Sequence, residues 1–481
     1  MESRKLKFCA ENSFENDKPK EACGVFGVYS VSNDSALSRT VYYGLYALQH
    51  RGQESAGIAV TSGHGINYHK GLGLVSEVFN DGILDNLRGH IAIGHVRYST
   101  TGSNTLINAQ PLVVKYRNGS LAVAHNGNLV NALEIRKELE QHGAVFQTTV
   151  DSEVIAFLIA RETSGDIEKA AMACMEKIRG SYALVIMTED SLIGVRDPKG
   201  IRPLCLGKYN GCYVLASESC ALDTVGAEFV RDVEPGEIVV INKNGIKSIK
   251  TKRDDESSLC IFEFVYFARP DSNIDGINIH TARWEAGRHL AHEHPADADI
   301  VVGVPDSGTV SAMGYAEASG IPFDVGLIKN RYIGRTFIQP SQKSRVLGVR
   351  LKLNALKEVI KGRRLVMVDD SIVRGTTSGQ IVKLLKDAGA KEVHVRVSSP
   401  PIRYSCYFGI DTSTQKELIG ARQQVEEIRK FIGADSLGYL SLEGLVKSTG
   451  LPATKFCTGC FSGKYPMQVP AEGKKYLFEK S

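Results

Sequence analysis

The feature that most constrains the fold is an alternation of strands and helices in the second half of the chain. The segments ADIVVGVPDSG (298–308) and RRLVMVDDS (363–371) each indicate an apolar strand that passes into a polar loop. Helical patterns follow these loops at 309–320 and 376–390, and KEVHVRVSS (391–399) indicates a further strand. Strand–loop–helix–strand units at this spacing predict a doubly wound parallel sheet.

The first half of the chain has a different order of predicted strands and helices. LAVAH (121–125), YALVIM (182–187) and EIVVIN (237–242) indicate short buried strands. Helical stretches lie between them, at 129–143 and 152–163. This order predicts an α/β layered domain.

A chain of 481 residues is too long for one ordinary core, so two domains or more are expected. The polar patch KRDDESS (252–258) has the composition of a linker. The predicted division is a leader, two domains and a tail, at 1–22, 23–255, 256–470 and 471–481.

Composition narrows the class of protein. A net charge of +4 is mild for this length, and no apolar stretch reaches the ~18 residues needed to cross a membrane. The first 22 residues lack the apolar core of a secretory signal. We therefore expect a cytoplasmic protein that binds neither nucleic acid nor membrane. Ten cysteines in such a chain indicate thiols, catalysis or metal rather than disulfides.

The stretch VMVDDSIVRGTT (366–377) indicates a phosphate-binding loop between a strand and a helix. Loop amides and a helix N-terminus can bind a phosphate dianion. Two adjacent acids would repel a phosphate, so they are expected to face ribose hydroxyls or Mg²⁺. The alternative is a turn whose Asp and Thr only cap the helix. The whole stretch resembles the loop of type I phosphoribosyltransferases that binds phosphoribosyl pyrophosphate (PRPP). Its candidate residues are Asp369, Asp370, Ser371, Arg374, Gly375, Thr376 and Thr377.

A second loop, VVGVPDSGT (301–309), also follows a strand of the predicted sheet, where ligands of such sheets bind. Its amides could bind pyrophosphate, with Ser307 as a metal-ligand candidate. The basic segment 329–345 is either an exposed loop or, between two phosphate loops, a lid that clamps the leaving pyrophosphate. The candidate residues here are Asp306, Ser307, Gly308, Lys329 and Arg331.

Near the N-terminus, KEACGVFG (20–27) places Cys23 behind a 22-residue leader. Cys23 is either an inert buried cysteine or an N-terminal nucleophile. In the second case its own α-amine, with a reference pKa of about 7.7–8.0, accepts the thiol proton. That chemistry requires cleavage after Ala22.

Three later stretches favour the nucleophile. Arg97 offers a guanidinium fork for a carboxylate. Asn126 and Gly127, expected in a tight turn at a strand end, could supply two oxyanion donors. Asp151 could pair with an ammonium. Taken singly, these residues could be a surface ion pair, a hairpin turn and a helix N-cap. Together with Cys23 they describe a pocket for an amino acid that carries an amide, and glutamine is the obvious occupant.

The N-terminal motifs resemble a class II glutamine amidotransferase domain; they are CGVFG, ALQHRGQESAG, GHVRYSTTG, AHNGNL and TTVDSE. Followed by GVPDSG and VMVDDSIVRGTT, their order resembles the glutamine PRPP amidotransferase family, which opens purine biosynthesis. The resemblance implies an αββα N-terminal-nucleophile domain followed by a type I phosphoribosyltransferase domain. It also implies the conversion of PRPP, glutamine and water to 5-phosphoribosylamine, pyrophosphate and glutamate, with ammonia passing internally from Cys23 to the ribose.

The same resemblance implies cofactors and regulation. We expect one Mg²⁺ per subunit, with Ser307, Asp369 and Asp370 as its candidate ligands, a homotetramer, and feedback inhibition by purine nucleotides. Two alternatives have other functions: a glutaminase that serves another ammonia acceptor, and a non-catalytic PRPP sensor.

The segment FCTGCFSG (456–463) holds a C-x-x-C pair, whose partners could be two distant cysteines. Spacing alone favours zinc over iron–sulfur, with free thiols as a further alternative. One branch of the family, however, combines a cleaved propeptide with a [4Fe–4S] cluster. The resemblance to that branch implies one cluster per subunit on Cys260, Cys406, Cys457 and Cys460. The leader is long for this branch, and Ala22 stands where an acid is often found.

Overall fold

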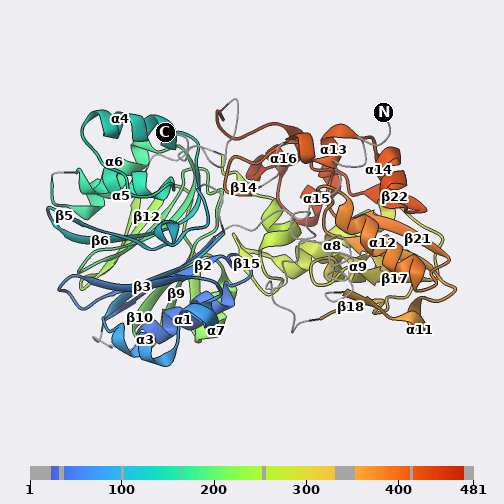
Figure 1. Ribbon diagram of the computed structural model, residues 1–481, viewed down its shortest axis with the longest axis horizontal. Coiled ribbons are helices and arrows are strands. Elements are labelled where there is room, and N and C mark those ends of the chain that lie inside the picture. The colour runs from blue at the N-terminus through green and yellow to red at the C-terminus, as the bar shows by residue number, and fades with distance from the viewer. Residues whose placement is uncertain are drawn as a thin grey trace.

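The structure is a computed structural model that describes residues 23–31, 37–98, 102–162, 164–251, 256–330, 353–411 and 415–470. The predicted leader, the C-terminal tail and Arg331 lie outside the described residues, as do residues 252–255 of the predicted linker and most of the basic segment. Figure 1 shows two bodies side by side, the N-terminal one in blue to green and the C-terminal one in yellow to red.

The N-terminal body is built on two antiparallel sheets. In spatial order, the first contains β11 (Glu228–Asp232), β9 (Cys205–Tyr209), β10 (Cys212–Ala216), β1 (Gly24–Ser30), β4 (Ile91–Arg97), β2 (Ser55–Thr61) and β3 (Ile66–Leu72). The second contains β13 (Gly245–Lys250), β12 (Glu237–Asn242), β8 (Leu192–Arg196), β7 (Gly180–Met187), β6 (Gly119–Leu129) and β5 (Leu112–Tyr116).

Helices cover the outer face of each sheet. The first sheet packs against α1 (Leu37–Ala47), α2 (Val75–Val78), α3 (Asp81–Asn86) and α7 (Ser219–Val225); the second packs against α4 (Ala132–Gln141), α5 (Ser152–Ala160) and α6 (Ile167–Lys177). Strand β1 shows how the sequence specifies the layers. Phe26 and Val28 pack toward the helices, whereas Val25 and Tyr29 pack between the two sheets. Successive side chains point to opposite faces, so a strand buried on both sides is apolar throughout. The predicted αββα arrangement is confirmed.

The C-terminal body contains a four-stranded parallel sheet, in the order β17 (Ile300–Gly303), β20 (Arg364–Asp369), β21 (Glu392–Val397) and β22 (Ser436–Tyr439). One face packs against α8 (Ile279–Glu293), α9 (Gly308–Ser319) and α15 (Leu442–Ser448), the other against α12 (Thr376–Asp387) and α14 (Val425–Ile432). Parallel strands covered on both faces are the doubly wound sheet that the strand–helix alternation predicts.

Short elements complete the second body. They are β14 (Leu259–Cys260), η3 (Glu263–Phe267, a π-helical turn), β15 (Asn273–Ile274), β16 (Ile277–Asn278), β18 (Leu327–Lys329), β19 (Leu353–Ala355), α11 (Lys357–Ile360), α13 (Ile419–Arg422), β23 (Phe456–Cys457) and α16 (Gly459–Ser462), with 3₁₀ turns at Gln415–Glu417 and Ala453–Lys455. A further 3₁₀ turn, Leu106–Asn108, lies in the N-terminal body between β4 and β5.

The two bodies are joined by polar contacts as well as by the chain. Asn128 Nδ2 donates to the carbonyl of Tyr407 at 2.9 Å, and Ser181 Oγ donates to that of Phe408 at 2.8 Å. The loop that carries these carbonyls therefore rests on β6 and β7.

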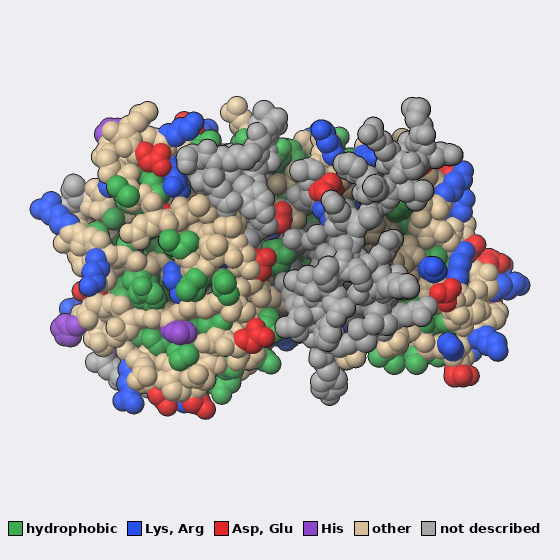
Figure 2. Space-filling model, in the orientation of Figure 1, with side chains coloured by type: hydrophobic (Ala, Val, Ile, Leu, Met, Phe, Trp, Pro, Cys, Tyr) green, Lys and Arg blue, Asp and Glu red, His purple; other side chains and the backbone are tan. Residues whose placement is uncertain are grey.

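The surface has mixed charge. On the face in Figure 2, basic and acidic side chains are interspersed around the C-terminal body. Among the described residues, no helix combines the length and the apolar composition that a membrane crossing requires.

Candidate active site

Cys23 lies directly before β1, beside the end of β4. The strand register pairs Gly24 with Val96, so Arg97 at the end of β4 is a close neighbour. The Cys23 thiol is buried and donates to the carbonyl of Tyr98 at 3.4 Å. Burial raises the pKa of this thiol, and the hydrogen bond with the backbone of Tyr98 and the charge of Arg97 only partly oppose that shift. A thiol in this environment needs a base to become a nucleophile.

Arg97 is only 2% exposed, which excludes the alternative of a surface ion pair. One of its Nη atoms donates to the carbonyl of Ser103 at 3.2 Å. Burial lowers its pKa, opposed by the neighbouring charges of Cys23, Glu54 and Asp151. The structure thus brings together three residues that the sequence predicts for one pocket. It adds Glu54, which sequence reasoning missed although it lies within the motif ALQHRGQESAG.

The expectation of a tight turn at Asn126 and Gly127 is wrong. Strand β6 continues through both residues to Leu129, with Gly127 opposite Tyr182 of β7. Gly127 has φ +147°, and a Cβ there would lie 2.0 Å from the carbonyl oxygen of Ser181. Only glycine fits this position, because β7 passes so close.

The side chain of Asn126 is completely buried, and neither its Oδ1 nor its Nδ2 has a hydrogen-bond partner in the part of the chain that the structure describes. Buried amides are normally hydrogen-bonded, and an exception calls for an explanation such as a ligand. The role of Asn126 as an oxyanion donor stays a prediction.

The direction of the Gly127 N–H follows from its neighbours on β6. The N–H of His125 donates to Gln110 Oε1 at 2.8 Å, and that of Leu129 donates to Asp151 Oδ2 at 2.8 Å. Alternate residues of a strand direct their N–H groups to the same edge. The N–H of Gly127 therefore points to the edge between these two contacts, away from β7.

Asp151 occupies the residue before α5 but makes no side-chain capping hydrogen bond. Its carboxylate instead receives the N–H of Leu129 and lies 3.9 Å from Nδ1 of His125. The helix-cap alternative is therefore wrong, and the carboxylate belongs to the same pocket as Arg97.

The two predicted phosphate loops lie at one edge of the parallel sheet. Strands β17 and β20 are parallel neighbours, so both loops follow the carboxyl ends of their strands. Asp369 and Asp370 are 1% and 0% exposed. Ser307 Oγ and Ser371 Oγ each donate to the carboxylate of Asp370. Ser307 and Asp370, two of the predicted magnesium ligands, are thus in direct contact across the sheet edge.

The first turn of α12 closes the Asp369–Asp370 loop. Gly375 precedes the helix with φ +82°, and its Cβ would lie 3.0 Å from Ile419 Cδ1. No side chain caps this helix start, so the capping alternative for the loop is not observed. Thr376 and Thr377 form the first turn, and Arg374 pairs with Glu417 at 3.0 Å. The helix N-terminus remains available to an anion.

The other predicted PRPP contacts that the structure describes lie around the loop after β17. Lys329 ends β18, and its Nζ lies 2.7 Å from Asp306 Oδ2, beside Ser307. Gly308 begins α9, where a Cβ would approach the carbonyl of Val368 to 2.5 Å. A cavity of about 540 Å³ opens beside this loop, with Asp306 and Lys329 in its lining.

The four cysteines predicted as cluster ligands converge in the C-terminal body. Parallel pairing of β14 with β23 sets Cys260 beside Cys457, and Cys460 follows in α16. Burial raises the pKa of Cys260 to about 12. Burial also raises the pKa of Cys460, and the nearby thiols of the other three raise it further. Within the described ranges, no group of three or more His, Cys, Asp or Glu is spaced to hold a single metal ion.

Comparison with known proteins agrees with this geometry. Residues 95–224 match the family described as glutamine amidotransferase domain, and residues 273–400 match phosphoribosyl transferase domain. The amidophosphoribosyltransferase of Bacillus subtilis is 52% identical over 454 residues, which cover 93% of this chain and 95% of that protein. The chain belongs to the amidophosphoribosyltransferase family. These enzymes catalyse the glutamine-dependent first step of purine biosynthesis, so the enzyme class predicted from motif order is confirmed.

Two further amidophosphoribosyltransferases show the same extent of likeness. That of Synechocystis is 53% identical over 460 residues, covering 94% of this chain and 92% of that protein. The solved structure of the B. subtilis glutamine PRPP amidotransferase, complexed with ADP and GMP, matches with a TM-score of 0.88 and 51% identity. It covers 94% of this chain and 98% of its own. The likeness therefore spans both bodies.

Proposed function

We propose that this amidophosphoribosyltransferase hydrolyses glutamine at Cys23 and passes the ammonia internally to C1 of PRPP bound at the edge of the parallel sheet. The observation that carries the proposal is the convergence of a buried thiol, a buried guanidinium, an unpartnered amide and a carboxylate at the end of β4 and β6. The chain would convert glutamine, PRPP and water to 5-phosphoribosylamine, pyrophosphate and glutamate.

Each residue of the glutamine pocket has one task. Arg97 would bind the α-carboxylate of glutamine and Asp151 its ammonium. The thiolate of Cys23 would attack the side-chain amide carbon, and the C–N bond would break to leave a thioester and release ammonia, before water hydrolyses the thioester to glutamate. Asn126 Nδ2 and the N–H of Gly127 would stabilise the oxyanion, each contributing about 3 kcal/mol at the transition state.

Removal of the leader is the first prediction. Burial raises the pKa of the Cys23 thiol, so an adjacent base is needed, and the free α-amine of a processed Cys23 would supply it. We expect the intact mass of active protein to lack residues 1–22, with Cys23 identified at the N-terminus by sequencing. Full activity in protein that retains the complete leader would show that another group accepts the thiol proton.

At the PRPP site, one loop would bind the 5′-phosphate and another loop the pyrophosphate. The amides of the loop after β20 and the start of α12 would hold the 5′-phosphate, and those of Asp306 to Gly308 the pyrophosphate, with Lys329 beside it. Arg331, predicted from the sequence, stays a further candidate contact of PRPP. The oxygen atoms of Ser307, Asp369 and Asp370 fit Mg²⁺, a hard cation that prefers oxygen ligands. Bound there, one Mg²⁺ per subunit would neutralise charge on the leaving pyrophosphate.

The four convergent cysteines support one [4Fe–4S] cluster per subunit. Tetrahedral zinc with sulfur at ~2.3 Å would require thiols packed around one ion, and the described residues offer no such group. The four thiolates that bind a cube of iron and sulfide lie farther apart than those around one ion. The thiols of Cys260, Cys406, Cys457 and Cys460 are near enough to affect the pKa of one another, which fits that arrangement.

The cluster gives the second prediction. Protein purified without oxygen should be brown, absorb at about 400 nm and contain iron and acid-labile sulfide in equal amounts. Cys457→Ser should lose most of this absorbance, whereas Cys174→Ser, a buried cysteine of α6, should retain it. A colourless protein with one zinc would overturn the assignment.

Regulation and assembly are proposed from the relatives. The B. subtilis structure holds ADP and GMP, which supports inhibition of this chain by purine nucleotides. A homotetramer is proposed from the family, and sedimentation analysis at micromolar concentration would test it.

The coupled reaction has a direct test. Glutamate release should be measured on anaerobically purified protein with and without PRPP and Mg²⁺. We expect PRPP to stimulate release, with pyrophosphate formed in equal amount. Glutaminase activity indifferent to PRPP would indicate another ammonia acceptor, and no activity in processed protein would favour a PRPP sensor.

A further inference from the structure

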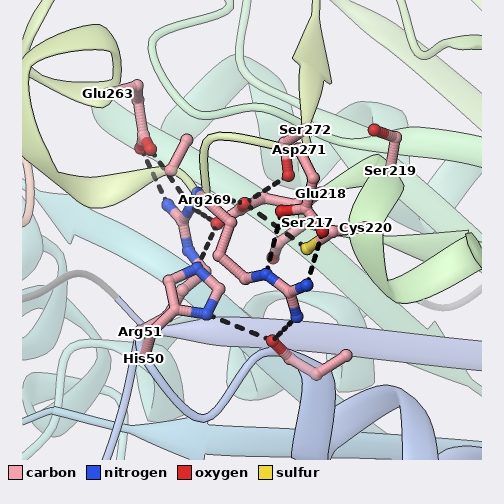
Figure 3. A network of polar contacts seen from close by, with 12 residues as sticks. His50, Arg51, Ser217, Glu218, Ser219, Cys220, Glu263, Arg269, Asp271 and Ser272 are labelled. Atoms are coloured by element: carbon pink, nitrogen blue, oxygen red, sulfur yellow. Dashed lines mark hydrogen bonds and ion pairs between the residues drawn. The ribbon is translucent and has the colours of Figure 1, made fainter. Parts of the chain in front are cut away.

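A buried ionic network connects the C-terminal body to the residue proposed as nucleophile, and Figure 3 shows the contact between Arg51 and Glu263 in this network. Arg51 donates twice to the carboxylate of Glu263, from Nη2 at 2.8 Å and Nη1 at 3.1 Å. The same guanidinium donates from Nε to the backbone carbonyl of Cys23 at 3.2 Å, and from Nη1 to Glu218. Glu263 belongs to η3 of the second body, whereas Arg51 and Cys23 belong to the first.

The carboxylate of Glu263 also receives a second guanidinium. Arg202 Nη1 donates to Glu263 Oε1 at 3.0 Å. Its Nε and Nη2 both donate to the carbonyl of Phe408, at 3.0 and 2.6 Å. The carboxylate of Glu263 therefore accepts hydrogen bonds from two arginines, and each of these arginines also donates to one backbone carbonyl.

The carbonyl held by Arg202 lies next to the proposed oxyanion donor. Gly409 follows Phe408 with φ +92°, and a Cβ on Gly409 would lie 3.0 Å from the carbonyl carbon of Gly127. Asn128 and Ser181 hold the same loop by their hydrogen bonds to Tyr407 and Phe408. The loop thus forms a backing against which the Gly127 peptide is placed.

Burial makes this network sensitive to the loss of one charge. Glu263 and Arg202 are 0% exposed, and Arg51 and Glu218 are 1% exposed. The two positive charges of the guanidiniums balance the two negative charges of the carboxylates. A neutral side chain at 263 would leave a buried positive charge without its partner, and the arginines would have to shift to new acceptors. The carbonyl of Cys23 would then lose its hydrogen bond from Arg51, and the carbonyl of Phe408 would keep only that from Ser181 Oγ.

We propose that Glu263 is a positioning residue for the glutamine half-reaction. Through Arg51 it fixes the backbone of Cys23, and through Arg202 it fixes the backing of Gly127. The inference rests on the proposed function, because it assigns the thiol and the amide their catalytic tasks. A single carboxylate of the phosphoribosyltransferase body would thereby set the geometry of nucleophile and oxyanion hole together.

The test is Glu263→Gln, compared with Glu237→Gln. Glu237 is a 1% exposed carboxylate with a bidentate Arg231 partner, distant from the site on β12. In Glu263→Gln we expect the glutamine-dependent kcat to fall about 10- to 100-fold, as for small misplacements of reacting groups. The KM for glutamine and the rate with ammonia in place of glutamine should change by less than about twofold, because Arg97, Asp151 and the PRPP loops are not altered. Glu237→Gln should leave all three quantities within about twofold.

A second variant separates positioning from stability. Gly409→Ala presses a methyl group toward Gly127, and we expect a lower glutamine-dependent kcat. Alkylation of Cys23 by iodoacetamide, followed by mass spectrometry of its peptide, should keep the wild-type rate, because that reaction develops no oxyanion. If Glu263→Gln does not fold, Gly409→Ala decides: a folded variant with wild-type glutamine-dependent kcat overturns the inference.

The remaining outcomes are distinct. A parallel fall of the glutamine and ammonia reactions in Glu263→Gln would show a structural role only, and would overturn the inference. Wild-type kinetics in Glu263→Gln, with an active parent, would also overturn it while leaving the proposed function intact. A parent protein that releases no glutamate would instead contradict the proposed function itself.

Discussion

Replacing Cys23 by alanine should abolish glutamine-dependent formation of phosphoribosylamine and preserve the reaction with ammonia. The thiol is the attacking atom, and no neighbouring side chain can take its place, because Arg97, Asn126 and Asp151 cannot form the thioester. The glutaminase kcat should fall by about four to six orders of magnitude, as when the nucleophile of a hydrolase is removed. Glutamate release and ammonia-dependent pyrophosphate release, measured on the same preparation, test both halves of this expectation.

The matched control is Cys212→Ala. Both cysteines are 6% exposed; Cys23 directly precedes β1, and Cys212 begins the neighbouring strand β10, opposite Ser30 at the far end of β1. The control variant should keep its activity within about twofold. Loss of the ammonia reaction in Cys23→Ala would point to a folding defect, and residual glutaminase above about one per cent would reveal a different nucleophile.

The sequence sufficed for features whose residues are contiguous. The loop after β20 was predictable because an apolar strand, two acids and a helix start follow one another within 366–377. Buried strands of the N-terminal body were predictable for a similar reason, since they are apolar along their whole length, whereas the αββα order of its layers was implied by the family resemblance.

Features that depend on distant residues were predicted less well. An Asn-Gly pair is typical of a hairpin turn, so a turn was expected at Asn126. The structure has a strand there because Gly127 pairs with Tyr182, more than fifty residues later. Local pattern contains no information about that pairing.

The ionic network illustrates the same limit. Arg51, Arg202 and Glu263 come from three separate parts of the chain and meet only once both bodies are folded. In the sequence, each is an ordinary charged residue that would be expected at the surface. The sequence motif around Arg51 supported the family resemblance, but its physical task became evident only from its contacts with Cys23 and Glu263.

Replacing Asp370 by asparagine should impair ammonia-dependent synthesis and spare glutaminase, which is the reverse of the result expected for Cys23→Ala. Glutamine-dependent and ammonia-dependent synthesis should both fall about 10²- to 10³-fold, because one carboxylate charge at the PRPP site is lost. Basal glutaminase should persist, since Asp370 lies at the edge of the parallel sheet and makes its described contacts with Ser307 and Ser371. Those hydroxyls can rotate to meet an amide, so the loop should keep its fold.

The control for this variant lies at the other end of the same strand. Asp297 pairs with Arg364 at the start of β20, is highly exposed, and is far along the strand from the ligand edge. Asp297→Asn should therefore leave synthesis within about twofold of wild type. If Asp370→Asn keeps normal synthesis at saturating PRPP and Mg²⁺, the carboxylate charge of Asp370 does not contribute to the reaction of PRPP. If it loses basal glutaminase as well, the two sites are coupled even without PRPP, and the contact between Phe408 and Ser181 of β7 is the first candidate for that coupling.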